Sequence, residues 1–218
     1  MKNIIFIAPP AAGKGTQSKL ISEEYNIPHI STGDLLRDEV ESGSVMGRFL
    51  KEEMDRGGLI SDDTIVNLLR TRITRVDCNN GYILDGYPRN VAQAKIYDDL
   101  LNDLGMNIGL VIFMDIDKEL ALKRTLSRVI CSACGASYNK EDSELVPKID
   151  GFCDKCGHTL KVRSDDSIET AKVRFDTYLE QTKPLVQYYE QRGILKSLKV
   201  EENDSAQDVF EKIKSIIG

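Results

Sequence analysis

The chain has 218 residues and a formal net charge of −6, with 41% hydrophobic and 29% charged residues. These values are typical of a globular domain, and the acidic balance argues against broad electrostatic binding to nucleic acid or to an acidic membrane surface. No apolar run is long enough to cross a bilayer, and no signal-peptide pattern follows Lys2. We therefore expect a cytoplasmic protein that binds neither nucleic acid nor membranes.

Strand-like runs alternate with helical patterns along the chain. We expect strands at 3–7, 28–30, 82–84, 108–114 and 194–200. We expect helices at 14–25, around 35–40 and 46–50, after a cap at 61–63, at 119–128, over 167–191 with a break near Pro184, and at 206–217. The alternation predicts an α/β fold with a parallel sheet covered on both faces, and the Gly-, Cys- and Asp-rich segment 130–163 predicts a small inserted domain.

The segment after the first expected strand has the layout of a phosphate-binding loop. Residues 8–16 read APPAAGKGT and open a helix. Backbone N–H groups of such a loop, together with the helix N-terminus, bind phosphate, and Lys14 would reach the outer phosphates. The match to G-x-x-x-x-G-K-[ST] is incomplete. Ala8 stands at the first glycine and Gly15 at the hydroxyl position, with Thr16 one place later.

Four cysteines of the insert have the spacing of a zinc site. Cys131 and Cys134 form one C-x2-C pair, and Cys153 and Cys156 form a second pair 18 residues later. Two disulfides are the alternative, which a reducing cytosol disfavours. Four thiolates leave no open coordination position, so the zinc would be structural. Cys78 stands apart, and we expect it to be a buried core residue or an inert surface thiol.

Polar residues also follow the third expected strand, in Asp85-Gly86-Tyr87-Pro88-Arg89. Open α/β sheets bind ligands at strand ends, so Asp85 would organise Mg²⁺ through water and Arg89 would hold a phosphate. A capped turn with a solvated arginine is the alternative.

We expect Arg124 and Arg128 to lie one helical turn apart on one helix face. Several arginines lie close to these motifs and to the ends of the cysteine-rich segment, and together they predict a polyanionic ligand that is bound from several sides. They are Arg37, Arg124, Arg128, Arg163 and Arg174.

Together these motifs resemble the adenylate kinase family, in its long bacterial type with a four-cysteine zinc lid. The matching segments span nearly the whole chain in the family order: 13–17, 31–37, 85–89, Gln93, the Arg124/Arg128 pair, the four cysteines, 163–166 and Arg174. The resemblance implies a P-loop kinase with a central five-stranded parallel sheet flanked by helices and a small zinc-binding lid. It implies a core of 1–30, 61–128 and 167–218, an AMP-binding insert of 31–60 and a zinc lid of 129–166.

The resemblance also implies an activity and a set of site residues. The activity is reversible phosphoryl transfer from Mg-ATP to AMP giving two ADP, by a monomer that maintains adenine nucleotide balance with Mg²⁺ and a structural Zn²⁺. Catalysis would rest on Lys14, Asp85, Arg89, Arg124, Arg128, Arg163 and Arg174. ATP would bind Ala11, Ala12, Gly13, Lys14, Gly15, Thr16, Arg124, Arg128 and Glu202. AMP would bind Thr32, Gly33, Arg37, Gly58, Ile60, Gly86, Arg89, Gln93, Arg163 and Arg174.

Two departures from the family pattern leave alternatives open. Ala8 and Ala11 stand where the family has glycines. Residues 201–203 stand where the family commonly has a glycine next to the ATP base. A catalytically weak nucleotide-binding protein, or a kinase for another nucleoside monophosphate, is therefore an alternative. A zinc-ribbon interaction module fits poorly, because the insert is acidic. We expect Pro9 and Pro10 to stiffen the loop so that Ala11 has a negative φ and loses nothing.

Overall fold

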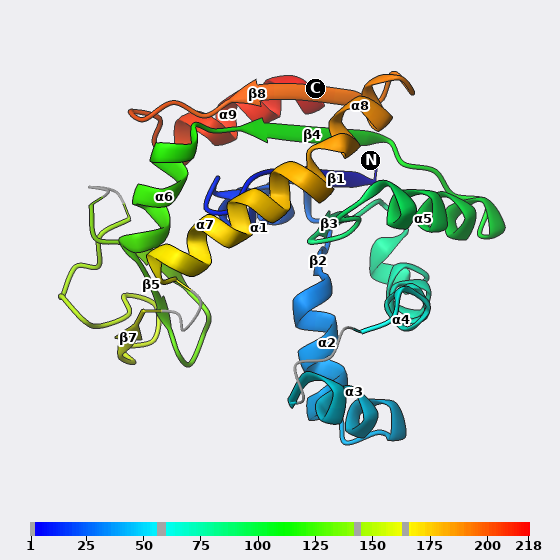
Figure 1. Cartoon of the computed structure of the whole chain (residues 1–218), viewed down its shortest axis with the longest axis horizontal. Coiled ribbons are helices and arrows are strands. Elements are labelled where there is room, and N and C mark those ends of the chain that lie inside the picture. Colours follow the sequence, from blue (N-terminus) through cyan, green and yellow to red (C-terminus); the bar gives the residue numbers. More distant parts are fainter. Residues whose placement is uncertain (1–2, 56–59, 142–144, 163–165) are drawn as a thin grey trace. The chain divides into compact units, whose positions relative to one another are not determined.

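The computed structural model describes residues 3–55, 60–141, 145–162 and 166–218 (Figure 1). Within these residues a parallel five-stranded sheet, flanked by helices, has the order β2-β3-β1-β4-β8. Its strands are β1 (Ile4–Ile7), β2 (His29–Ser31), β3 (Ile83–Asp85), β4 (Leu110–Asp115) and β8 (Leu195–Lys199). The α/β fold and the five predicted strands are confirmed. The four residues of β1 are all buried, as an inner strand of a parallel sheet requires.

By its contacts the chain forms two compact units. The first unit comprises Met1–Ile7, Ser18–Ile112 and Gln181–Lys196, and the second comprises Ala8–Gln17, Phe113–Glu180 and Ser197–Gly218. Helix α1 (Lys14–Tyr25) begins in the second unit and continues in the first. None of the helices in the described part of the chain combines the length and the apolar character of a membrane span.

The first unit packs its helices around buried tyrosines. Tyr82 and Tyr97 are fully buried, and their hydroxyl groups share a hydrogen bond. Helices α2 and α3 pack closely at Gly47, where a Cβ would lie 2.1 Å from the carbonyl oxygen of Glu39. The helices that lie wholly in this unit are α2 (Thr32–Glu41), α3 (Val45–Asp55), α4 (Asp62–Ile73), α5 (Val91–Asp103) and α8 (Pro184–Glu190).

The second unit carries the cysteine-rich insert. A three-stranded antiparallel sheet in the order β6-β5-β7 forms its frame, with β5 at Arg128–Cys131, β6 at Ser137–Asn139 and β7 at Leu160–Lys161. Its small core consists of Val129, Cys131, Ala136, Tyr138 and Cys153. Helices α6 (Lys118–Leu126) and α7 (Ile168–Thr177) lie on either side of it in sequence, and α9 (Ala206–Ile217) closes the chain. A π-helical turn, Tyr178–Thr182, joins α7 to the residues before Pro184, which confirms the expected break.

The predicted helix 119–128 is wrong at its end. Helix α6 stops at Leu126, and the Ser127 backbone N–H and hydroxyl both donate to the Lys123 carbonyl oxygen. The next residue, Arg128, opens β5 and pairs with Asn139. Arg124 and Arg128 therefore do not share a helix face. The β-branched residues that follow Arg128 favour a strand, which agrees with the end of the helix before it. Helix α5, which begins after the Asn90 cap, was not predicted.

Candidate functional site

The loop between β1 and α1 bends through left-handed backbone at two residues, Ala11 with φ 60 and Gly13 with φ 88. The expectation of a negative φ at Ala11 is wrong. The Ala12 N–H donates to the Pro9 carbonyl oxygen over 3.4 Å, so residues 9–12 form a turn with Pro10 at its second position. A turn of type II places proline there and requires a positive φ at the next residue. Proline is common at the second position of both type I and type II turns, so Pro10 is compatible with the left-handed conformation of Ala11 and does not prevent it.

This loop delivers three predicted ATP residues to the first turn of a helix. Lys14, Gly15 and Thr16 begin α1, whose first turn contains no acidic side chain. The Gln17 N–H donates to the Gly13 carbonyl oxygen over 3.0 Å, which continues the loop into the helix. Successive N–H groups in such a bend, together with the positive end of the helix dipole, create an anion site. The geometry therefore suits phosphate.

A second polar turn follows β3 in the first unit. The β2–β3 register pairs Ser31 with Asp85, and His29 Nε2 lies 3.2 Å from Asp85 Oδ2. Gly86 has φ 83, and a Cβ on it would lie 3.0 Å from Thr32 Oγ1, so the start of α2 lies directly against this turn. Arg89 Nε donates to the Gly86 carbonyl oxygen over 2.9 Å. The turn thus gathers three predicted AMP residues and Asp85.

The amide of Gln93 organises the same turn. Its Oε1 accepts from the Arg89 backbone N–H over 2.8 Å, and its Nε2 donates to Asp62 Oδ1 over 2.7 Å. Gln93 is 9% exposed. Asp62 was not predicted as a partner of Gln93, although the Ser61 cap places it in the first turn of α4.

Of the remaining predicted AMP residues, Gly33 and Arg37 lie in α2, Arg174 lies in α7, and two lie outside the described residues. Arg37 is exposed and forms an ion pair with Asp34, and its Nη1 lies 3.4 Å from where a Cβ of Gly33 would be. Ile60 is half-buried. Gly58 and Arg163 lie outside the described residues, as do Ser164 and Asp165 of the 163–166 motif.

In the second unit, one buried carboxylate holds two of the predicted catalytic arginines. Arg128 Nε donates to Asp166 Oδ2 over 2.9 Å and Arg128 Nη2 donates to Asp166 Oδ1. Arg174 Nη1 lies 3.7 Å from Asp166 Oδ1, and the Asp166 side chain is 0% exposed. A paired buried carboxylate fixes both guanidinium groups in place. Glu202, by contrast, is exposed and its Oε1 lies 3.2 Å from Lys123 Nζ.

The four insert cysteines converge on one point. All four sulfur atoms lie within 4.8 Å of one another, with Cys131–Cys156 at 3.4 Å and Cys134–Cys153 at 3.5 Å. These separations exceed a disulfide bond of about 2.05 Å and fit the edges of about 3.8 Å of a tetrahedron with Zn–S bonds of about 2.3 Å. The cysteines therefore have the donor set and spacing for one zinc ion.

Tyr138 supports this cluster from inside the insert. The Asp154 N–H donates to the Tyr138 hydroxyl oxygen over 2.8 Å, and that hydroxyl lies 3.4 Å from Cys153 Sγ. The hydrogen bond from Tyr138 lowers the pKa of Cys153 to about 6, which favours the thiolate that a metal requires. Cys78 lies elsewhere, is 2% exposed and contacts Arg72, so the first of its two expected states, a buried core thiol, is confirmed.

Comparison with known proteins agrees with this geometry. A sequence model of the adenylate kinase family matches residues 6–194. The chain is 45% identical over 216 residues to an adenylate kinase of Clostridioides difficile (strain 630), covering 99% of this chain and 98% of that protein. It is 44% identical over 216 residues to one of Thermosipho africanus (strain TCF52B), with the same coverage, and 41% identical over 215 residues to one of Thermoanaerobacter sp. (strain X514), covering 99% and 97%. The chain therefore belongs to the adenylate kinase family and is an ATP–AMP phosphotransferase.

Proposed function

We propose that this enzyme moves the terminal phosphoryl group of Mg-ATP to AMP with the phosphate loop and arginines of the second unit and the acceptor residues of the first. The phosphate loop supports the assignment most strongly, because left-handed Ala11 and Gly13 bend the backbone just before Lys14. The bond from phosphorus to the β–γ bridging oxygen breaks, and a bond to an AMP phosphate oxygen forms. Such transfer needs positioning and charge stabilisation and no covalent intermediate on the protein.

On the donor side, Lys14 and the backbone of 11–16 bind the phosphates of ATP. Arg124, Arg128, Arg163 and Arg174 neutralise charge on the transferring group, and Asp166 holds two of them in position. Mg²⁺ bound with ATP would offset the charge of the phosphates, and Asp85 would hold its hydration shell. This arrangement fits a loop with Gly15 at the hydroxyl position.

On the acceptor side, Arg37 and Arg89 bind the AMP phosphate and Gln93 pairs with the adenine edge. Gln93 uses one lone pair of Oε1 and one proton of Nε2 within the chain, so each atom keeps a further bonding site for a base. Asp62 and the Arg89 N–H orient that amide. The other proposed AMP residues are Thr32, Gly33, Gly58, Ile60, Gly86, Arg163 and Arg174.

A panel of acceptors tests this assignment. With Mg-ATP as donor, AMP should give the highest kcat/KM among AMP, GMP, CMP and UMP. A preference for another monophosphate would favour the alternative kinase, and nucleotide binding without turnover would favour the weak binder.

We also propose that the chain works as a cytoplasmic monomer, with segments 1–30, 61–128 and 167–218 as its core, 31–60 as the AMP-binding insert and 129–166 as the lid. Sedimentation at working concentration tests the monomer.

Zinc is the metal we propose for the cysteine cluster, as a structural ion that stabilises the insert. Protein purified under reducing conditions should hold one zinc per chain, and chelation should lower Tm. Cys153→Ser should lose the metal. The matched control, Cys78→Ser, should retain it, because Cys78 lies outside the cluster. Folded, active protein without metal would contradict the proposal.

A further inference from the structure

The insert carries its four cysteines in two turns of the same form. In the first knuckle, residues 131–136, the N–H of the first residue donates to the carbonyl oxygen of the sixth over 2.8 Å, and the N–H of the fifth donates to the carbonyl oxygen of the first over 3.1 Å. The second knuckle, residues 153–158, repeats both bonds at 2.8 Å. The first and fourth residues of each knuckle are cysteines, so the two knuckles hold their sulfur atoms on equivalent turns.

Each knuckle contains one buried and one exposed cysteine. Cys131 and Cys153 are buried, whereas Cys134 and Cys156 are exposed. Two sulfur–sulfur contacts cross from one knuckle to the other, and each joins a buried cysteine to an exposed one: Cys131–Cys156 at 3.4 Å and Cys134–Cys153 at 3.5 Å. An exposed thiolate beside a second thiol is the arrangement in which oxidation leads to a disulfide.

Contacts between protein atoms hold the two knuckles next to each other. The β5–β7 register pairs Cys131 with Leu160, whose N–H donates to the carbonyl oxygen of Gly151, just before the second knuckle, over 2.8 Å. The Tyr138 hydroxyl oxygen accepts from a backbone N–H of the second knuckle over 2.8 Å and lies 3.4 Å from Cys153 Sγ. These contacts do not involve a metal, so we expect the crossed cysteines to stay neighbours when zinc leaves.

We propose that the cysteine cluster is an oxidation site, where hydrogen peroxide converts the four thiolates into two crossed disulfides that replace zinc in holding the insert together. The crossed disulfides are Cys131–Cys156 and Cys134–Cys153. This proposal takes its starting state from the zinc site proposed above, but the pairing follows from the sulfur positions alone. Zinc and the crossed disulfides both connect the two knuckles, whereas a disulfide within either C-x2-C pair would leave the knuckles unconnected.

The reaction consumes one hydrogen peroxide for each disulfide. The exposed thiolate attacks a peroxide oxygen, the O–O bond breaks, and a sulfenic acid and a hydroxide ion form. The buried thiolate across the cluster then attacks the sulfenic sulfur, the S–O bond breaks, and a second hydroxide ion leaves as the S–S bond forms. The two sulfur atoms lose two electrons and the two peroxide oxygens gain them. Zinc leaves because it requires thiolate ligands.

Treatment of the zinc-loaded wild type with hydrogen peroxide tests the proposal. The measurements are zinc released to a coloured indicator, free thiols in the denatured protein, and disulfide-linked tryptic peptides. One zinc per chain should be released, and one of the five thiols should remain, that of Cys78, which is 2% exposed. A dithiol reductant with added zinc should restore the starting state. Zinc retained after the thiols are lost would overturn the proposal.

The tryptic peptides identify the pairing. Trypsin cuts between the cysteines of the second knuckle, at Lys155, but leaves those of the first in one peptide, 129–140. Crossed disulfides should link this peptide to both 149–155 and 156–161, with Cys131 bound to 156–161. Disulfides within the knuckles would instead link 149–155 to 156–161. That result, or a bond from Cys131 to 149–155, would overturn the proposal.

Two matched variants each keep one crossed pair. Cys134→Ser should form a single disulfide that links peptide 129–140 to 156–161. Cys156→Ser should form a single disulfide that links 129–140 to 149–155. The same linked peptide in both variants would contradict the crossed pairing, and the wild-type map is an independent test of it.

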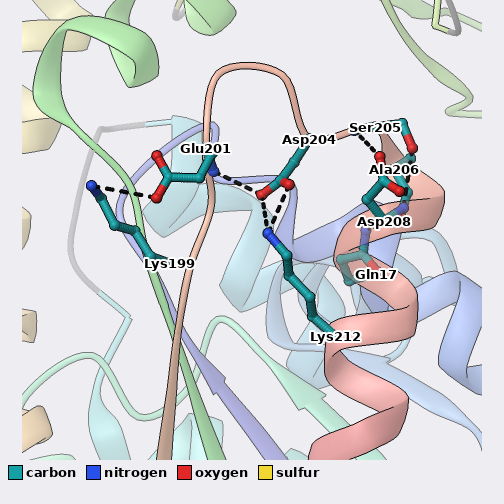
Figure 2. Close-up of polar contacts among 8 residues, drawn as sticks. All are labelled: Gln17, Lys199, Glu201, Asp204, Ser205, Ala206, Asp208 and Lys212. Carbon is teal, nitrogen blue, oxygen red and sulfur yellow. Dashed lines mark hydrogen bonds and ion pairs between the residues drawn. The ribbon is translucent and has the colours of Figure 1, made fainter.

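Oxidation should also replace the stability that zinc provides. Oxidised, metal-free protein should have a Tm about 5 °C or more above that of chelated, reduced protein, because each disulfide restricts the unfolded chain. The control is Lys212→Ala, which removes contacts of 2.7 and 2.6 Å from Lys212 Nζ to the Asp204 carboxylate (Figure 2). Gln17 still donates to the Ala206 carbonyl oxygen at the start of the same helix, over 2.8 Å.

The Lys212→Ala variant should melt below the wild type yet release zinc and pair its cysteines as the wild type does. Oxidised wild type that melts no higher than the chelated protein would overturn the proposal. Unoxidised protein that holds no zinc would contradict the metal proposed above, and the linked peptides would still decide the pairing.

Discussion

The loop after β1 and the turn after β3 both follow buried strands and both pass through left-handed backbone, but they do so with different residues. In the loop, Ala11 has φ 60 and Gly13 has φ 88. In the turn, Gly86 has φ 83, and a Cβ on it would lie 3.0 Å from Thr32 Oγ1. At Gly13 no described atom lies within 4 Å of a Cβ position.

The difference shows that a positive φ and a close neighbour are separate constraints on a residue. An L-residue with positive φ costs about 1 kcal/mol or more from its own backbone. A close neighbour adds a second cost, which arises from packing against the side chain that must move. An alanine at position 13 would therefore meet the first cost alone, whereas an alanine at position 86 would meet both.

The largest expected effect comes from replacing the cationic side chain of each segment, which is Lys14 in the loop and Arg89 in the turn. Lys14→Met should lower kcat by about three orders of magnitude or more, because a charge that stabilises the transferring group is lost. Arg89→Met should act mainly on KM for AMP. Coupled assays with both substrates varied distinguish the two, and thermal melting checks that each variant folds. An unchanged kcat in Lys14→Met would contradict the phosphate-loop assignment.

The second effect tests the close neighbour of Gly86. Gly86→Ala should raise KM for AMP by about tenfold to a hundredfold, because the new methyl group displaces Thr32, a proposed AMP residue. The matched control is Gly105→Ala, whose φ of 65 is also positive but whose Cβ position has no described atom within 4 Å. Both variants should lose a similar stability from backbone strain, and only Gly86→Ala should change AMP kinetics. Equal kinetics in the two would mean that the Thr32 contact has no role in AMP binding.

Local features of this chain could be predicted from its sequence. The apolar run of β1, the Ser61 cap of α4 and the cysteine spacing each depend on neighbours in sequence, and each is found in the structure. The end of α6 was not predicted, because helical periodicity continues past Ser127 while strand pairing with Asn139 decides the outcome. The prediction for the φ of Ala11 was wrong because proline fixes its own φ and not that of the residue after it, so a turn with proline at its second position can still have a left-handed next residue.

The contacts that organise the site could not be predicted from sequence. Asp166 holds Arg128 across 38 residues, Asp62 meets Gln93 across 31, and Gln17 reaches Ala206 across 189. Each pair forms because separate helices and strands or loops pack together, and the spacing of the two residues along the chain does not predict the contact. The predicted ligand residues were visible as motifs, while the partners of the residues that orient them became known only from the fold.

The smallest effect concerns Ala11 itself. Ala11 has φ 60 in the structure, and we expect the loop to keep this conformation when ATP binds, so the strain is the same in the free and bound enzyme and cancels from the binding step. Ala11→Gly should therefore change kcat/KM for ATP by less than about threefold, and its benefit should appear in stability. Ala8→Gly is the control, because Ala8 is not among the described residues with positive φ. Both glycines make the unfolded chain more flexible, which costs stability, but only Ala11→Gly also relieves strain of about 1 kcal/mol. Its Tm should exceed that of Ala8→Gly by about 2–4 °C in a chain of this size. A gain in kcat/KM beyond about tenfold would instead mean that ATP has to force the alanine into its left-handed conformation, and that the alanine weakens the enzyme.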